Sequence, residues 1–328
     1  MARVAIIGTG GTISSFGEDP FDVQDYIRHG RMGDAATMLD YFSDVRRLAD
    51  LVPIAFPPIA STRLGFKEWQ LLIAEIDRLS ADPSIDGIVI LHGTASMEET
   101  AYALSLTAPT DTPIALTGSQ RPATALSADG GANISAAVRT VLSPDARGMG
   151  VLLVMNEEIH AAREVTKTST WRLQTFKTPD FGALGHADAD AVVFYRRPLR
   201  VPESPPFDIR GIETPPRVDI AYAHQDADAV AVEAFAAAGA KGIVVAAFAP
   251  GLVPPAMLEA LADATKAGIT CVGSCRAGSG RVVALSPLRN AGLIAADNLN
   301  PQKARILLQL ALLTPRTPEE IATLFATH

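Results

Sequence analysis

Short apolar runs, each followed at once by polar residues, recur along the first half of the chain. Val4-Ala-Ile-Ile7 leads into Gly8-Thr-Gly-Gly-Thr12, and the apolar runs within 87–91, 113–116 and 150–155 follow the same scheme. Uninterrupted apolar runs of this length, bounded by turn residues, are typical of strands buried on both faces of a sheet. The pattern therefore predicts four buried strands whose ends carry polar side chains.

Segments with helical spacing lie between these runs. A helix is predicted over 66–79, where apolar residues recur at intervals of three and four: Trp69, Leu72, Ile73 and Ile76. Further helices are expected to begin near Met97 and, after a cap at 127–129, to run to about 142. Alternating strands and helices predict a large N-terminal domain with a mostly parallel α/β sheet.

The strongest linker signal is the stretch 198–216, which holds six of the 23 prolines. We therefore divide the chain into an N-terminal domain at 1–197, a linker at 198–216 and a smaller C-terminal α/β domain at 217–328. In the C-terminal domain, strands are predicted at 218–223, 242–247 and 270–272, and helices at 227–237, 254–266, 301–313 and from 318.

Composition narrows the classes of function. The 328 residues carry a net charge of −8, so the basic surface that nucleic-acid binding needs is not expected. No apolar run approaches the ~18 residues of a membrane span, and only three residues precede the first strand. We expect a cytoplasmic protein with no membrane partner. Cys271 and Cys275 form neither a disulfide framework nor a zinc motif, and no metal site is predicted.

The turn after the first strand is compatible with three interpretations. A dinucleotide-binding fingerprint needs a third glycine, but that position is Ile13. Thr12 can instead serve as an attacking hydroxyl, or the turn can be a tight connection without chemistry. The turn alone does not decide among these interpretations.

Later motifs favour the attacking hydroxyl. Taken in order, five segments resemble the bacterial L-asparaginase (asparaginase/glutaminase) family: Thr9-Gly-Gly-Thr-Ile13, the segment from His92-Gly-Thr to Tyr102, the segment from Thr117-Gly to Gly130, Arg163-Glu-Val-Thr-Lys-Thr168 and Asn298 to Arg305. The resemblance covers nearly the whole chain. It implies two α/β domains, a homodimer or homotetramer, and hydrolysis of a small side-chain amide to an acid and ammonia without a metal or cofactor.

The resemblance also implies roles for individual residues. Thr12 matches the nucleophile, and Tyr26 matches the tyrosine that assists it from a lid, here the polar loop 14–31. Thr94 and Lys167 match a second threonine and its lysine, and Ser61 matches a serine that holds the substrate's α-carboxylate. A lysine in a partly buried site can have its pKa lowered and act as a base. The backbone N–H groups at 94 and 95 are expected to bind the oxyanion.

Several positions depart from the family pattern. Ala95 and Ser96 replace the usual aspartate and threonine, and Thr62 replaces a glutamine that contacts the substrate. The lost aspartate normally contacts the lysine and binds the substrate's α-ammonium group. We hypothesise that the hydrolytic centre is kept while free asparagine is not the best substrate, with Arg63 as a candidate for holding a carboxylate. The rival hypothesis is a catalytically weak homologue that binds or senses a small molecule.

The remaining acids and histidines have simpler interpretations. Glu98 and Glu99 open a helix, where negative charge is favourable. Asp129 is expected to cap a helix, although it can also replace the lost aspartate beside Lys167. His160 and His186 are expected on the surface.

Overall fold

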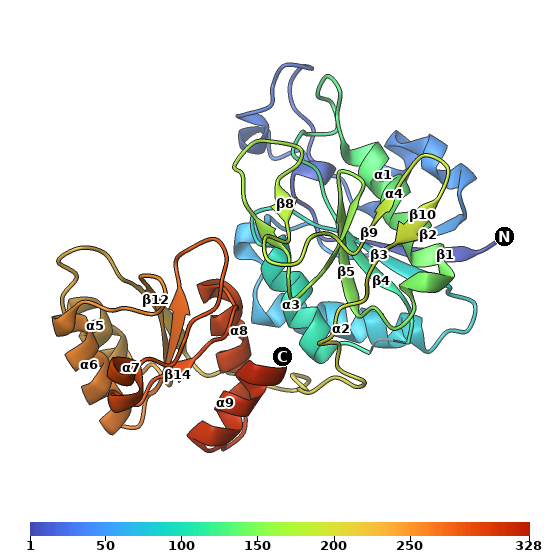
Figure 1. Cartoon of the computed structure of the whole chain (residues 1–328). Coiled ribbons are helices and arrows are strands. Elements are labelled where there is room, and N and C mark those ends of the chain that lie inside the picture. The colour runs from blue at the N-terminus through green and yellow to red at the C-terminus, as the bar shows by residue number, and fades with distance from the viewer. Residues whose placement is uncertain (110) are drawn as a thin grey trace. The chain divides into compact units, whose positions relative to one another are not determined.

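Residues 1–109 and 111–328 are described by a computed structural model, in which the chain divides into two units, Met1–Pro206 and Phe207–His328 (Figure 1). The division falls inside the proline-rich stretch 198–216. Each unit has its own sheet and its own hydrophobic core. The predicted class, a large N-terminal α/β unit followed by a smaller α/β unit, is confirmed.

The N-terminal unit is built on an eight-stranded sheet in the order β10-β9-β6-β5-β4-β3-β1-β2. Strands β1 to β5 run parallel, whereas β6, β9 and β10 are antiparallel to their neighbours. The strands are β1 (Arg3–Gly8), β2 (Asp50–Ile54), β3 (Gly87–Leu91), β4 (Ile114–Thr117), β5 (Val151–Met155), β6 (Glu158–Ala161), β9 (Gly185–Ala187) and β10 (Val192–Phe194).

Burial explains why the parallel strands could be predicted. Every residue of β3, β4 and β5 is buried, so these strands show no alternation of polar and apolar positions. Among the described residues, four α-helices accompany the sheet: α1 (Ala35–Tyr41), α2 (Phe66–Ser80), α3 (Met97–Thr107) and α4 (Gly130–Leu142). The apolar stripe predicted for α2 is buried, which confirms that helix.

The short polar elements were not predicted. Strand β2 ends at Ile54, and it lies at the sheet edge, where its Pro53 is tolerated. A separate hairpin pairs β7 (Thr166–Lys167) with β8 (Phe176–Lys177). Elements of two to four residues are too short to show a period.

The C-terminal unit has a four-stranded parallel sheet in the order β11-β12-β13-β14. Asn300 caps α8 by accepting a hydrogen bond from the Lys303 N–H, and Pro301 is the first residue of that helix, as predicted. The elements are β11 (Val218–Tyr222), α5 (Val230–Ala237), β12 (Gly242–Ala247), α6 (Pro255–Lys266), β13 (Thr270–Cys275), α7 (Ser286–Asn290), β14 (Ile294–Ala295), α8 (Pro301–Ala311) and α9 (Pro318–Thr327).

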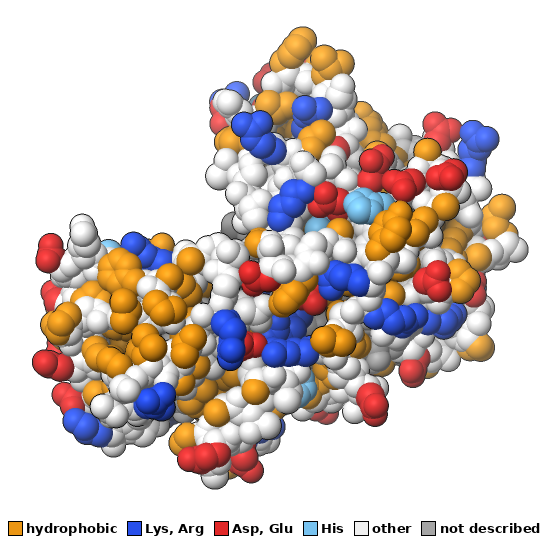
Figure 2. Space-filling model, viewed as in Figure 1, with side chains coloured by type: hydrophobic (Ala, Val, Ile, Leu, Met, Phe, Trp, Pro, Cys, Tyr) orange, Lys and Arg blue, Asp and Glu red, His pale blue; other side chains and the backbone are white. Residues whose placement is uncertain are grey.

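Hydrophobic side chains gather on the face of the C-terminal unit that Figure 2 shows. The large hydrophobic residues exposed in this unit are Tyr222, Val230, Leu252 and Val283.

None of the described helices is both long enough and apolar enough to cross a membrane.

Candidate active site

Two strand-end loops touch through glycines at the carboxyl edge of the N-terminal sheet. A Cβ added to Gly11 would lie 2.1 Å from the Gly93 Cα, and one added to Gly93 would lie 2.6 Å from the Ser61 Oγ. Gly11 also has a φ of +88°, which favours glycine. Because these loops follow the neighbouring strands β1 and β3, their contact brings Thr12 and Thr94 to one place.

A cavity of about 300 Å³ opens where these loops meet. Segments that are far apart in the sequence contribute to its lining. Seven of the nine residues predicted for the site line this cavity: Thr12, Tyr26, Ser61, Thr62, Thr94, Ala95 and Lys167. Carboxyl ends of parallel strands are where open α/β sheets bind ligands, so the position of the cavity agrees with the topology.

The other two predicted residues are not among those that line the cavity. Ser96 donates a hydrogen bond from its Oγ to the Ser61 carbonyl oxygen, at 2.7 Å. It therefore ties the start of α3 to the loop that carries Ser61. Arg63 is exposed at the end of a short 3₁₀ helix, Ser61–Arg63.

The first hydrogen-bonded pair in the cavity is a threonine with a tyrosine. The hydroxyl oxygens of Thr12 and Tyr26 lie 2.8 Å apart. Tyr26 comes from the 3₁₀ helix Tyr26–His29 inside the predicted lid loop, and its side chain is buried. Burial raises the pKa of the Tyr26 phenol, so this phenol is protonated at neutral pH and can donate a hydrogen bond or relay a proton.

The second hydrogen-bonded pair in the cavity is a threonine with a lysine. Lys167 donates from its Nζ to the Thr94 Oγ1 at 2.7 Å. Burial lowers the pKa of the Lys167 ammonium, and the negative charge of Glu98 partly opposes this by raising it. Glu98 is buried in the first turn of α3. The helix-terminus interpretation of Glu98 was therefore incomplete, because its charge also acts on the lysine.

Asp129 organises a loop. Its carboxylate accepts the backbone N–H groups of Gln120 at 2.9 Å and Arg121 at 3.0 Å, together with the Asn133 Nδ2 at 3.1 Å. Asp129 occupies the N-cap position of α4, but its side chain makes no capping hydrogen bond there. The alternative in which it replaces the missing aspartate beside Lys167 gains no support from these contacts.

The charges around the cavity have one sign. Among the described residues that line it, Arg31 and Lys167 are basic and none is acidic. The Arg31 guanidinium also donates to the Gly17 carbonyl oxygen within the lid loop. Across residues 1–109 and 111–328, no group of three or more His, Cys, Asp or Glu side chains is placed to hold a metal ion.

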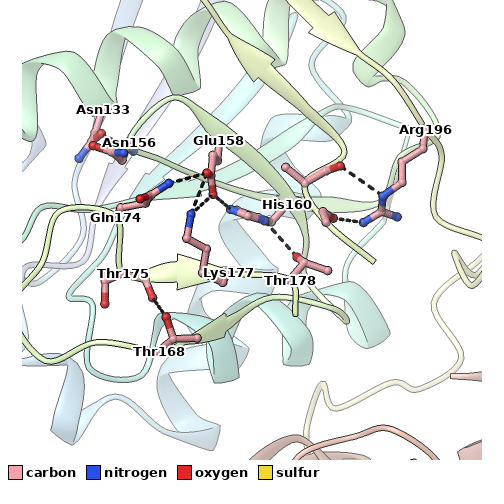
Figure 3. A network of polar contacts seen from close by, with 12 residues as sticks. Asn133, Asn156, Glu158, His160, Thr168, Gln174, Thr175, Lys177, Thr178 and Arg196 are labelled. Atoms are coloured by element: carbon pink, nitrogen blue, oxygen red, sulfur yellow. Dashed lines mark hydrogen bonds and ion pairs between the residues drawn. The ribbon is translucent and has the colours of Figure 1, made fainter. Parts of the chain in front are cut away.

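A polar network fastens the β7–β8 hairpin, which carries Lys167, to the main sheet (Figure 3). Lys177 of β8 donates to the Glu158 carboxylate of β6 at 2.8 and 3.0 Å, and Gln174 donates to the same carboxylate at 3.0 Å. The His160 Nε2 lies 3.3 Å from the Glu158 Oε2, and its Nδ1 lies 3.0 Å from the Thr178 Oγ1.

The prediction that His160 lies on the surface is wrong. His160 is 1% exposed, and burial lowers the pKa of its imidazole. Hydrogen bonds, chiefly from His160, lower the pKa of the Glu158 carboxyl to about 2. Strand β6 (Glu158–Ala161) is too short for an alternation of polar and apolar residues to show that His160 faces inward.

We predict that Glu158→Gln destabilises the protein, and more so at pH 7 than at pH 3. Losing charge-assisted hydrogen bonds is expected to cost about 2 kcal/mol in the free energy of unfolding. Because the folded-state pKa of Glu158 lies below its ordinary value of 4.5, the carboxylate stabilises the fold above about pH 4.5 and loses this effect as the pH falls toward 2. Urea denaturation at pH 7 and pH 3 measures both effects.

A surface pair provides the control for Glu158→Gln. Asp263 pairs with Lys266 at 2.8 Å, but both side chains are about three-quarters exposed. Asp263→Asn is therefore expected to change stability by less than about 1 kcal/mol. Equal effects of the two substitutions would contradict the anchoring role of Glu158.

Several cavity-lining residues had not been singled out as candidates from the sequence. Gln120 lies in a segment used for the family resemblance, but at a position to which the motif assigns no role. Arg31 and Trp171 lie in loops and Ile27 lies in the short 3₁₀ helix Tyr26–His29, where no period indicates which side chains face a ligand. No signal in the sequence identifies Glu98, because an acid in the first turn of a helix shows the same pattern whether or not a lysine lies near it.

Comparisons with known proteins match both units. Residues 3–200 match the family described as "Asparaginase, N-terminal", and residues 217–325 match the "Glutaminase/Asparaginase C-terminal domain". The L-asparaginase 2 of Bacillus subtilis (strain 168) is 36% identical over 326 residues, which span 99% of this chain and 86% of that protein. These matches extend across both units of the fold.

Two further relatives differ in the cellular location that their names give. The Haemophilus influenzae protein named "Probable L-asparaginase periplasmic" is 35% identical over 328 residues, covering 99% of this chain and 93% of that protein. The crystal structure of a probable cytoplasmic L-asparaginase from Campylobacter jejuni matches with a TM-score of 0.94 and 37% identity, covering 100% of both chains. Because these names differ, a cytoplasmic location stays a prediction for this chain. Assembly into a homodimer or homotetramer also stays a prediction.

Proposed function

The chain belongs to the asparaginase/glutaminase family of amidohydrolases, and from this premise we propose that it hydrolyses the carboxamide of a small anionic substrate through attack by Thr12. The products are a carboxylate and ammonia. The observation that carries the proposal is that two hydrogen-bonded pairs share one cavity. In each pair a threonine hydroxyl meets a group that can transfer a proton: Thr12 meets Tyr26, and Thr94 meets Lys167. An amide carbon is a poor electrophile, so both an activated hydroxyl and a proton relay are needed.

Thr12 forms the new bond. Its Oγ1 attacks the amide carbon, and its proton passes through Tyr26 toward the amide nitrogen. The carbon–nitrogen bond then breaks, ammonia leaves, and an ester to Thr12 remains. Water hydrolyses this ester, giving the carboxylate and restoring the threonine hydroxyl. The 2.8 Å distance between the two hydroxyl oxygens supports direct proton transfer.

Thr94 and Lys167 supply the base for the second half of the reaction. The lowered pKa of Lys167 increases the fraction of neutral amine, which can take a proton through Thr94 from the attacking water. The backbone N–H groups of Thr94 and Ala95 make no hydrogen bond to other described residues, so they are available to a developing oxyanion.

The charges of the cavity favour a substrate with a carboxylate and without a free ammonium group. Arg31 and Lys167 attract an anion, and no described acidic side chain lines the cavity to pair with an ammonium. Burying an unpaired ammonium is costly. Ala95 is exposed toward the cavity, where it offers a methyl group in place of a charge.

Ammonia release from a panel of amides tests this proposal. We expect succinamate or N-acetyl-asparagine to give a higher kcat/KM than free asparagine. A much higher kcat/KM for asparagine would contradict the altered preference and leave the amidohydrolase proposal intact. Absence of turnover with every amide, combined with ligand-induced thermal stabilisation, would favour the rival function of a small-molecule-binding or sensor protein.

A further inference from the structure

Gln120 lines the cavity but has no role in the reaction described above. It lies in the loop that follows β4, and its residue is 8% exposed. Its side-chain Nε2 is buried and has no hydrogen-bond partner among the described residues. Buried polar groups normally find partners, so an unpaired amide nitrogen on a side chain that lines a cavity indicates a ligand that completes this carboxamide.

The backbone around Gln120 is held firmly. Asp129 accepts the N–H groups of Gln120 and Arg121, and the Asn133 amide donates both to Asp129 and to the Gly118 carbonyl oxygen at 2.9 Å. The Gln120 side chain therefore extends from an ordered loop. Rotation about the terminal torsion of Gln120 by about 180° exchanges Oε1 and Nε2. The side chain can therefore present either an acceptor or a donor to a ligand.

The rest of the cavity defines the chemistry of that ligand. A carboxamide is neutral and pairs well with another amide, which also offers one donor and one acceptor. Ile27 and Trp171 line the same cavity and are 70% and 60% exposed, so they provide an apolar surface near its opening. An acyl group can bury its apolar part against such a surface.

We propose that Gln120 binds a neutral amide group of the substrate, which makes the substrate an N-acylated ω-amide of the N-acetyl-asparagine type. The carboxylate of such a molecule suits the basic cavity, and its acylated nitrogen needs no acidic partner. The acyl group lies toward Ile27 and Trp171. The substrate class rests on the proposed function, whereas binding through Gln120 can be tested without turnover.

Gln120→Leu tests the role of this carboxamide. Succinamate has no acylated nitrogen, so it serves as the reference substrate. We expect the ratio of kcat/KM for N-acetyl-asparagine to that for succinamate to fall about 10-fold, since one lost hydrogen bond is worth roughly this factor. Unchanged discrimination in an active variant would overturn the role of Gln120 and leave the proposed hydrolysis standing.

Gln309 offers a matched control in the C-terminal unit. It is also buried, at 4% exposure, but its Nε2 donates to the Pro216 carbonyl oxygen at 2.9 Å. Gln309→Leu is expected to lower Tm, because it leaves that oxygen unpaired, and to leave the substrate ratio unchanged. Gln120→Leu is expected to keep or raise Tm. A fall in Tm as large as that of Gln309→Leu would overturn the proposal.

Binding separates failure of this proposal from failure of the proposed function. If the wild type hydrolyses no amide, the shift in Tm produced by N-acetyl-asparagine still reports its binding. A larger shift in the wild type than in Gln120→Leu supports the contact. Equal shifts, or none in either protein, overturn it.

Discussion

Lys167→Met is expected to lower kcat by about 10³-fold, with a much smaller change in KM. The substitution keeps most of the side-chain length but removes the only group that hydrogen-bonds the Thr94 hydroxyl among the described residues. Thr12→Ala is expected to lower kcat at least as much, because it removes the proposed nucleophile. Ammonia release under saturating substrate measures both losses, and Tm checks that each variant is folded.

The double variant tests whether these residues act in one reaction. Combining Thr12→Ala with Lys167→Met is expected to cost little more than Thr12→Ala alone, since groups of one mechanism are not additive. Lys266→Met, at an exposed site, is the control and is expected to have no effect on kcat. Retention of more than a tenth of wild-type kcat by Lys167→Met would contradict its role as the base.

The pH dependence follows from the same lysine. In the proposed mechanism its neutral form is the base, so kcat/KM is expected to rise with pH through a pKa below the ordinary 10.5. The Glu98 carboxylate raises that pKa, so Glu98→Gln is expected to lower it and move the acid limb of the profile to lower pH. Glu99→Gln removes the same charge one residue away and serves as the matched control. A shift toward higher pH with Glu98→Gln would contradict the assignment.

Three residues that share the cavity could be singled out because they lie after or within recognisable patterns. Thr12 and Thr94 come directly after buried strands, and Lys167 lies in a distinctive motif. The sequence does not reveal contacts that depend on how segments meet in space. Glu98 fits a helix start whether or not a lysine lies nearby, and the partners of His160 come from short strands without a period.

The same limit applies to specificity. Gln120 is identified only when burial, an unpaired atom and a cavity coincide, and none of these is visible in the sequence. The fold class, in contrast, is visible in the sequence. Strands that are buried on both faces of a sheet require uninterrupted apolar runs, and these runs can be recognised directly. Strands β6 to β10 and helix α1 were missed, since they are short or partly polar.

Ala95→Asp is expected to raise kcat/KM for free asparagine by about 10- to 100-fold. Ala95 is exposed in the lining of the cavity, so a carboxylate at this position can reach a ligand. A charge-assisted hydrogen bond to the substrate's ammonium is worth about 1.5–3 kcal/mol, which corresponds to this range. Steady-state ammonia release measures the change in kcat/KM for asparagine and for N-acetyl-asparagine.

Ala95→Asn separates charge from size in this experiment. It has nearly the same volume as the aspartate variant but offers no negative charge, so it is expected to gain little activity with asparagine. The aspartate variant also adds a second anion near Lys167, besides Glu98, which is expected to raise the lysine pKa and move the acid limb to higher pH. An equal gain from both substitutions would show that space rather than charge limits asparagine, and would contradict the electrostatic basis of the proposed preference.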